Sequence, residues 1–114
     1  ADYYDKAFAG NSKLITPKRA SYSTHVFHQY TLRTQNIDRF ALKDFLSTKN
    51  IPAMVYYPVP LHFQKAYTDK RYKQGDFPVT EKLCESVISL PIHTEMDTEM
   101  LKYITDGVLE FVNR

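Results

Sequence analysis

The chain has 114 residues, of which 43% are hydrophobic, 25% charged and 14% aromatic. This length is close to the commonest size of one domain, and the composition excludes a disordered or fibrous chain. The formal net charge of +2 is too small to indicate a nucleic acid or an anionic membrane as partner by itself.

The first residues predict the end of an amphipathic helix. Tyr4, Ala7 and Phe8 recur at helical spacing, and Gly10 followed by Asn11 ends the pattern. No capping residue precedes this helix, so we expect the chain to be a piece of a longer protein. Processing of a complete small protein is the alternative.

A strand and a helix are expected next. Residues 25–33 alternate between two faces and are rich in β-forming side chains, which predicts a strand. A helix is expected from an N-cap at Asn36 to about Lys49, where Asn50 ends it in a left-handed conformation. Its predicted buried stripe consists of Ala41, Leu42, Phe45 and Leu46.

Two further strand-and-helix patterns complete the chain. A second strand is expected at 53–57, followed by a long connection over residues 58–76. A helix over about 79–88 leads into a third strand at 88–92, in which Pro91 favours an edge or a strand end.

The last helix is expected over about 98–112, with Asp97 as its N-cap and a stripe of Leu101, Ile104, Val108 and Phe111. The whole pattern predicts an α+β domain in which helices cover one side of a small three-stranded sheet.

Several kinds of site are not indicated by the residues. The three glycines are far apart, which excludes a glycine-rich phosphate loop. His25 and His28 would point to opposite faces of the predicted strand, and His62 and His93 lie in different loops, so we expect no metal site. Cys84 lies on the apolar side of a predicted helix and is expected to be a buried small hydrophobe rather than a nucleophile.

A single cysteine also excludes an intrachain disulfide and suits a reducing compartment, so we expect a cytoplasmic protein. The longest uncharged apolar run, residues 51–61, contains three prolines and is far shorter than the ~20 residues that span a bilayer. No membrane segment is therefore expected.

Two segments are candidates for binding. Residues 65–73 interleave tyrosines with cations, which is typical either of a solvated loop or of a site for a nucleotide-like ligand or negatively charged partner. Tyr56 and Tyr57 are followed by two prolines that fix the path to His62, so this edge can present hydroxyl and imidazole groups to a polar ligand. Arg33 is a candidate for binding a carboxylate or phosphate, or a buried structural arginine.

Four ordered segments carry a family resemblance. Residues 25–33, 50–62, 75–81 and 89–93 resemble successive motifs in the C-terminal small domain of the DegT/StrS family of pyridoxal-phosphate-dependent sugar aminotransferases. The resemblance implies a mostly antiparallel sheet and places residues 1–10 at the end of an interdomain helix and 11–114 in the small domain. It also implies that the large, cofactor-binding domain lies outside this chain.

The resemblance further implies a homodimer that moves an amino group from a donor such as glutamate to a keto sugar linked to a nucleotide. Such reactions serve the synthesis of cell-surface polysaccharides or antibiotic sugars. Tyr56 and Tyr57 fall where relatives place a pair that contacts the sugar, and His62, Gln29 and Tyr30 are further candidates for the same pocket.

None of the ten lysines matches the Schiff-base lysine of the family, so we expect no catalytic or cofactor-binding residue in this chain and no transamination by the chain alone. A free-standing α+β module that binds a polar ligand or partner through residues 56–62 is the alternative. The coding frame upstream of Ala1 distinguishes the two. A nucleic-acid binder acting through residues 65–73 is a third hypothesis, and it predicts steeply salt-dependent binding.

Overall fold

Three short strands form an antiparallel sheet in the order β1–β2–β3 in the computed structural model, which describes residues 1–114. The strands are β1 (Leu14–Ile15), β2 (Tyr30–Thr34) and β3 (Val87–Leu90). In the central pair Leu32 lies opposite Ile88, and Tyr30 lies opposite Leu90. The α+β class with a three-stranded antiparallel sheet is therefore confirmed.

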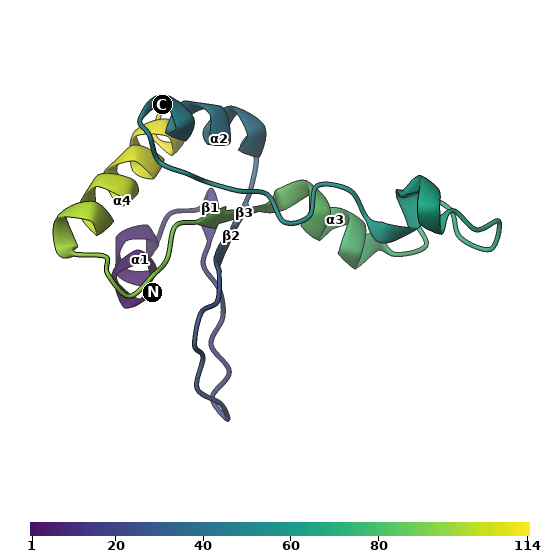
Figure 1. The fold of residues 1–114 in the computed structure, drawn as a ribbon, viewed down its shortest axis with the longest axis horizontal. Helices are drawn as coiled ribbons and strands as arrows, with labels where there is room; N and C mark the ends of the chain where they lie inside the picture. The colour runs from purple at the N-terminus through teal and green to yellow at the C-terminus, as the bar shows by residue number, and fades with distance from the viewer.

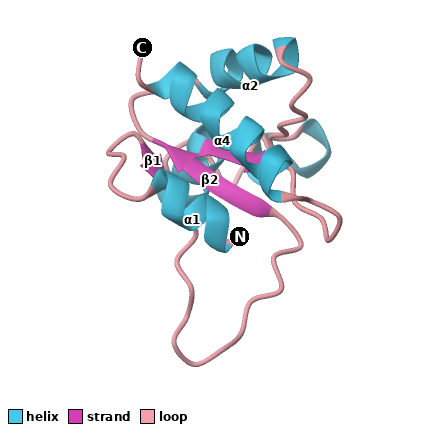
Figure 2. Ribbon diagram, turned by 90° about the vertical axis from the view of Figure 1, so that its left-hand side faces the viewer, coloured by secondary structure: helices cyan, strands magenta, loops and turns pink.

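Four α-helices accompany the sheet: α1 (Asp2–Phe8), α2 (Arg39–Thr48), α3 (Pro78–Ser86) and α4 (Thr98–Val112). Helix α4 packs against both α1 and α2, and these three helices lie together over one side of the sheet (Figure 2). Two short 3-10 turns, η1 (Leu61–Phe63) and η2 (Lys65–Tyr67), interrupt the long connection before α3.

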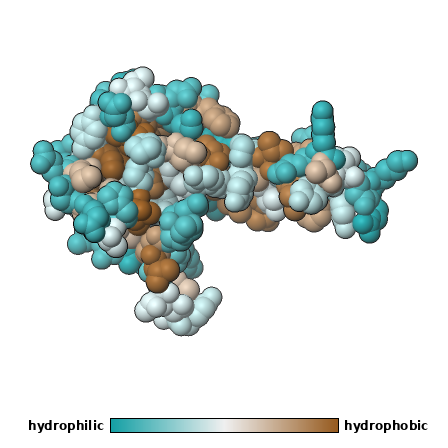
Figure 3. Space-filling view, viewed as in Figure 1, coloured by the Kyte–Doolittle hydropathy of each residue, from teal (hydrophilic) through white to brown (hydrophobic).

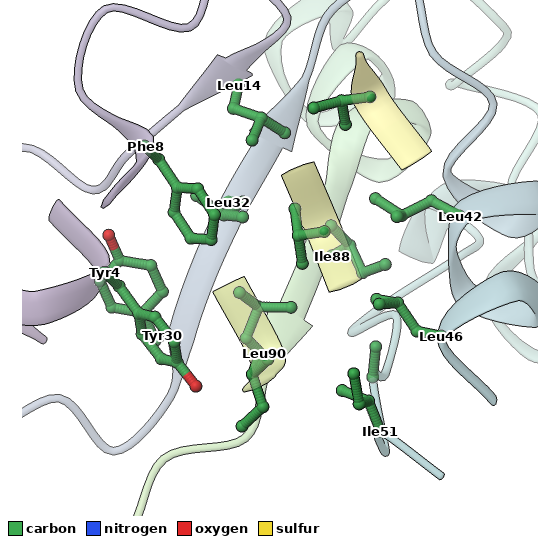
Figure 4. Close-up of a cluster of buried hydrophobic side chains, with 14 residues drawn as sticks. Tyr4, Phe8, Leu14, Tyr30, Leu32, Leu42, Leu46, Ile51, Ile88 and Leu90 are labelled. Atoms are coloured by element: carbon green, nitrogen blue, oxygen red, sulfur yellow. The ribbon is translucent and has the colours of Figure 1, made fainter. Parts of the chain in front are cut away.

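The core lies between the sheet and these helices (Figure 4). Along β2 the burial alternates, so that Tyr30, Leu32 and Thr34 are buried whereas Arg33 is exposed. The exposure of Arg33 excludes its role as a buried structural arginine. The other large, fully buried side chains come from all the packed elements: Tyr4, Phe8, Leu42, Leu46, Ile88, Val108 and Val112.

Local sequence signals predict the two longest helices well. Helix α4 has the predicted bounds, and the Asp97 carboxylate accepts the N–H of Met100 as its cap at 2.8 Å. Helix α2 is capped by Asp38 rather than by the predicted Asn36, because the Asp38 carboxylate accepts the N–H groups of Phe40 and Ala41. Asn36 instead takes a left-handed conformation with φ of 54°.

The predicted stripe of α2 is correct at three of its four positions. Leu42 and Leu46 are fully buried and Phe45 packs partly buried against the core, but Ala41 is exposed. Arg39 is buried in its place and donates to the carbonyl of Val87 at 3.2 Å. The predicted left-handed end at Asn50 is confirmed by a φ of 57°.

The strand predictions need three corrections. The first predicted strand begins at Tyr30 instead of residue 25, since residues 25–29 have no strand partner. The second, at 53–57, is reduced to one bridge between Met54 and Ser89, and the prolines on either side cannot donate to a ladder. Strand β1 was not predicted, because two residues carry no periodic pattern.

Two segments project from the packed body (Figures 1 and 3). We call residues 16–29 the finger and residues 57–86, which include α3, the arm. Helix α3 has no fully buried residue, and Val79 on its predicted buried side is 72% exposed. Cys84 is partly exposed, so its predicted full burial is wrong. None of the helices has the length and apolar character that a membrane-spanning segment needs.

Candidate functional site

An open hollow lies where β3 ends and the chain enters β2. Its volume is about 320 Å³, and three segments line it: residues 28–29, residues 52–56 and residues 89–92. The Met54–Ser89 bridge holds two of these segments together, with N–H to carbonyl distances of 3.0 and 2.7 Å. The hollow is therefore built on hydrogen-bonded backbone although much of its lining is loop.

Two of the predicted substrate-binding residues meet in this hollow. Gln29 comes from the segment before β2 and Tyr56 from the segment after the bridge, and both line it. An amide both donates and accepts hydrogen bonds, and so does a phenol. Together they suit a ligand with several hydroxyl groups.

Tyr57 follows Tyr56 but does not line the hollow. The two rings meet edge to face with centroids 6.0 Å apart, and the peptide bond between the residues is cis. The Tyr57 side chain is 72% exposed, so its phenol remains free to contact a ligand or another part of the protein.

Tyr30, a further predicted candidate, lies in the core instead. Its ring packs 4.8 Å from that of Tyr4, and its hydroxyl donates to the carboxylate of Asp5 at 2.6 Å. Burial, together with the hydrogen bond to Asp5, raises the pKa of Tyr30 well above its usual range. In this structure Tyr30 joins α1 to β2 and does not reach the hollow.

His62 lies on the arm, in a second recess with an aromatic wall. Its Nε2 is 3.0 Å from Oε1 of Glu81, and the two side chains are only 9% and 14% exposed. The imidazole also packs between Phe63 and Phe77, with ring centroids 4.2 and 4.8 Å away. The structure thus separates His62 from Tyr56 and Gln29.

Glu81 is the functional candidate that sequence reasoning missed. Its carboxylate accepts the N–H groups of Gly75 and Phe77 in addition to contacting His62. Glu81 looks like a helix-surface neighbour of Glu85 in the sequence. The available signal is its place in the first turn of a helix that begins with Pro78, where a carboxylate can reach back to free N–H groups.

The remaining histidines do not assemble a site. His25 precedes β2, and its Nδ1 accepts the N–H of Phe27 at 2.9 Å. The prediction that a strand places His25 and His28 on opposite faces is therefore wrong, since neither residue lies in a strand. No group of three or more histidine, cysteine, aspartate or glutamate side chains is placed to hold a metal ion.

Residues 1–109 match the model of the DegT/DnrJ/EryC1/StrS aminotransferase family. The chain is 40% identical over 98 residues to a pleiotropic regulatory protein of Geobacillus stearothermophilus, covering 86% of this chain and 26% of that protein. It is 34% identical over 84 residues to dTDP-3-amino-3,6-dideoxy-alpha-D-galactopyranose transaminase of Aneurinibacillus thermoaerophilus, covering 74% of this chain and 22% of that protein.

A solved structure extends this similarity to the fold. The crystal structure of DesV from S. venezuelae, in complex with a ketimine intermediate, superimposes with a TM-score of 0.91 at 29% identity. The alignment covers 99% of this chain and 30% of that one. The chain thus spans about a quarter of the length of these curated relatives. Because the family match extends over nearly all of its residues, the chain belongs to the DegT/DnrJ/EryC1/StrS aminotransferase family.

Proposed function

We propose that this chain is the C-terminal small domain of a pyridoxal-phosphate-dependent aminotransferase that acts on nucleotide-linked keto sugars. Glutamate is the proposed type of amino donor, and residues 1–10 are the proposed end of an interdomain helix. The complete protein is proposed to be a cytoplasmic homodimer in the synthesis of surface polysaccharides or antibiotic sugars. The observation that carries the proposal is the hollow in which Gln29 and Tyr56 converge.

The hollow is suited to a sugar but not to the cofactor by itself. A Schiff base needs a lysine amine, and no lysine lines the hollow. We therefore propose that the cofactor, which supplies an electron sink when bound, is held by a part of the protein outside these 114 residues.

The chain's own residues would then orient the sugar. The Tyr56 hydroxyl and the Gln29 amide can each hydrogen-bond a sugar hydroxyl, and the aliphatic side chains of Met54 and Ile92 can contact the apolar face of the ring. The main contribution of such residues to the reaction is that they hold the keto carbon in one position relative to the cofactor.

Changing Tyr56 to phenylalanine in the complete protein is expected to lower kcat/KM for the keto sugar about tenfold, the effect of one lost hydrogen bond. The kcat/KM for glutamate should not change, because the hydroxyl contacts only the sugar. Tyr103→Phe is the matched control, since it removes the same hydroxyl from α4, outside the hollow. Equal loss in both variants, or loss for both substrates of Tyr56→Phe, would contradict the proposed role.

The 114-residue chain alone is expected to show no transamination and no absorption band of bound cofactor when mixed with pyridoxal phosphate, glutamate and a nucleotide-linked keto sugar. The physical reason is the lack of a lysine in the hollow. Turnover by the chain alone would contradict the proposal that the cofactor is held outside these residues.

A further inference from the structure

Two side chains of α1 reach the segments that form the hollow, although α1 itself does not line it. The Tyr4 hydroxyl donates to the carbonyl of Pro91 at 2.8 Å, and Pro91 is part of the lining. The Asp5 carboxylate accepts the hydroxyl of Tyr30 at 2.6 Å, and Tyr30 directly follows Gln29 in the chain. Helix α1 is therefore bonded to both sides of the hollow, at the start of β2 and just after the end of β3.

The two tyrosines lie in the core. Both are 0% exposed, and their rings pack with centroids 4.8 Å apart. Figure 4 shows the rings side by side with their hydroxyls at opposite ends, so each hydroxyl serves a different segment. A buried hydroxyl that loses its partner costs the free energy of its desolvation, because no water replaces the lost hydrogen bond. Movement of either segment away from α1 is therefore resisted.

The finger is tied to the same carboxylate. Oδ1 of Asp5 accepts from Tyr30, and Oδ2 accepts from Nη2 of Arg19 at 2.6 Å. The Arg19 guanidinium lies 4.8 Å from the centroid of the Phe27 ring, and Phe27 stacks on Tyr30 at 5.9 Å. The chain is thus held on both sides of Gln29, whose own side chain is exposed in the hollow.

We propose that Tyr4, Asp5 and Tyr30, which we call the α1 clamp, are positioning residues for the sugar. They set the places of Gln29 and of the Pro91 wall in the hollow without touching the sugar themselves. The effect on sugar turnover rests on the proposed function, whereas the clamp itself rests only on the contacts described above. Because a misplacement of about 1 Å can cost ~100-fold in rate, even slight loosening of the clamp is measurable.

Tyr30→Phe in the complete protein tests the proposal, because it removes one hydroxyl and keeps the ring in the core. The kcat/KM for the keto sugar is expected to fall about tenfold, and the kcat/KM for glutamate should not change. Thr34→Val is the matched control. The buried Thr34 hydroxyl also donates to a backbone carbonyl, that of Ser86 at 3.1 Å, but it lies at the other end of β2 and outside the hollow. This variant should leave both constants unchanged.

A double variant separates positioning from a general loosening of the core. The clamp acts on the sugar through Gln29, so Tyr30→Phe should change the kcat/KM for the sugar by less than about twofold once Gln29 is replaced by alanine. A full loss in the Gln29→Ala background, an equal loss in Thr34→Val, or a matching loss for glutamate would overturn the proposal.

Hydrogen exchange of the complete protein tests the clamp without any turnover. The Ser89 N–H donates to the Met54 carbonyl at 2.7 Å beside the hollow. Tyr4→Phe and Tyr30→Phe should each speed the exchange of this amide about fivefold, and Thr34→Val should not. Unchanged exchange in either tyrosine variant would overturn the clamp. Absence of transamination by the unaltered complete protein would contradict the proposed function instead, so the two failures are distinguishable.

Discussion

Truncating Leu32 to alanine is expected to lower the free energy of unfolding by about 3 kcal/mol, as large-to-small changes in well-packed cores do. Leu32 is 0% exposed at the centre of β2 and lies opposite Ile88. The lost methyl groups leave a cavity that the hydrogen-bonded strands on either side cannot close by moving. Since a domain of this size is stable by only about 5–15 kcal/mol, the effect is a large share of the total.

Urea unfolding of the chain measures this effect through the transition midpoint and slope. Leu61→Ala is the matched control, because it makes the same chemical change on the arm at a side chain that is 57% exposed. It should lower the free energy of unfolding by less than about 1 kcal/mol. Similar values for the two variants would show that Leu32 does not occupy a tightly packed core.

Changing Glu81 to alanine is expected to loosen the arm without unfolding the body. The variant removes the acceptor of the Gly75 and Phe77 N–H groups and leaves His62 without its partner. The Gly75 amide should therefore lose about tenfold of its protection from hydrogen exchange, because it loses the carboxylate that accepts its N–H. Protection in β2 and β3 should not change.

The control for this variant lies on the same helix. Glu85→Ala removes an exposed carboxylate one turn further along α3, and the side chain of Glu85 makes no hydrogen bond in the structure. Its effect on helix propensity is the same, so a loss of Gly75 protection in both variants would contradict the assigned role of Glu81.

The same contact predicts a pH dependence of the arm. Burial by itself raises the pKa of Glu81, but the N–H groups of Gly75 and Phe77 and the side chain of His62 outweigh it and lower the pKa below 4.5. A carboxyl whose pKa is lower in the folded state stabilises that state above its unfolded pKa. This stabilisation is lost as the pH falls through the lower folded value. Gly75 protection, corrected for intrinsic exchange, should therefore hold at pH 6 and decline below about pH 4.5, and a flat profile would contradict the assignment.

Features set by local physics could be predicted from the sequence. Helix α4 has its predicted bounds because a strong cap at Asp97 coincides with a continuous apolar stripe. The left-handed residue at Asn50 follows in the same way from the side chain's tolerance of that conformation. The prediction of a strand at 53–57 was wrong because β-propensity does not show whether a pairing partner lies within reach. The flanking prolines limit the ladder there to one bridge.

The candidate site shows the same division. Of the two predicted residues that line the hollow, Gln29 was a candidate only through the family resemblance, whereas Tyr56 was already a candidate from its place before two prolines. Their convergence depends on the Met54–Ser89 bridge, a contact between distant segments. The sequence likewise could not show that Tyr30 is held in the core by Asp5 while His62 is held on the arm by Glu81.

By itself, the sequence predicted a small α+β fold, because composition, caps and apolar periodicity act over a few residues at a time. The family was indicated separately, by the resemblance of four ordered motifs. Its composition excluded a disordered or fibrous chain without a structure, and its mild charge gave no indication of a nucleic acid or an anionic membrane as partner. Only the tertiary structure decided which side chains share a hollow, because that depends on long-range strand pairing. Tertiary packing also left α3 and the aromatic arm outside the core, although the periodicity of α3 alone predicts a buried face.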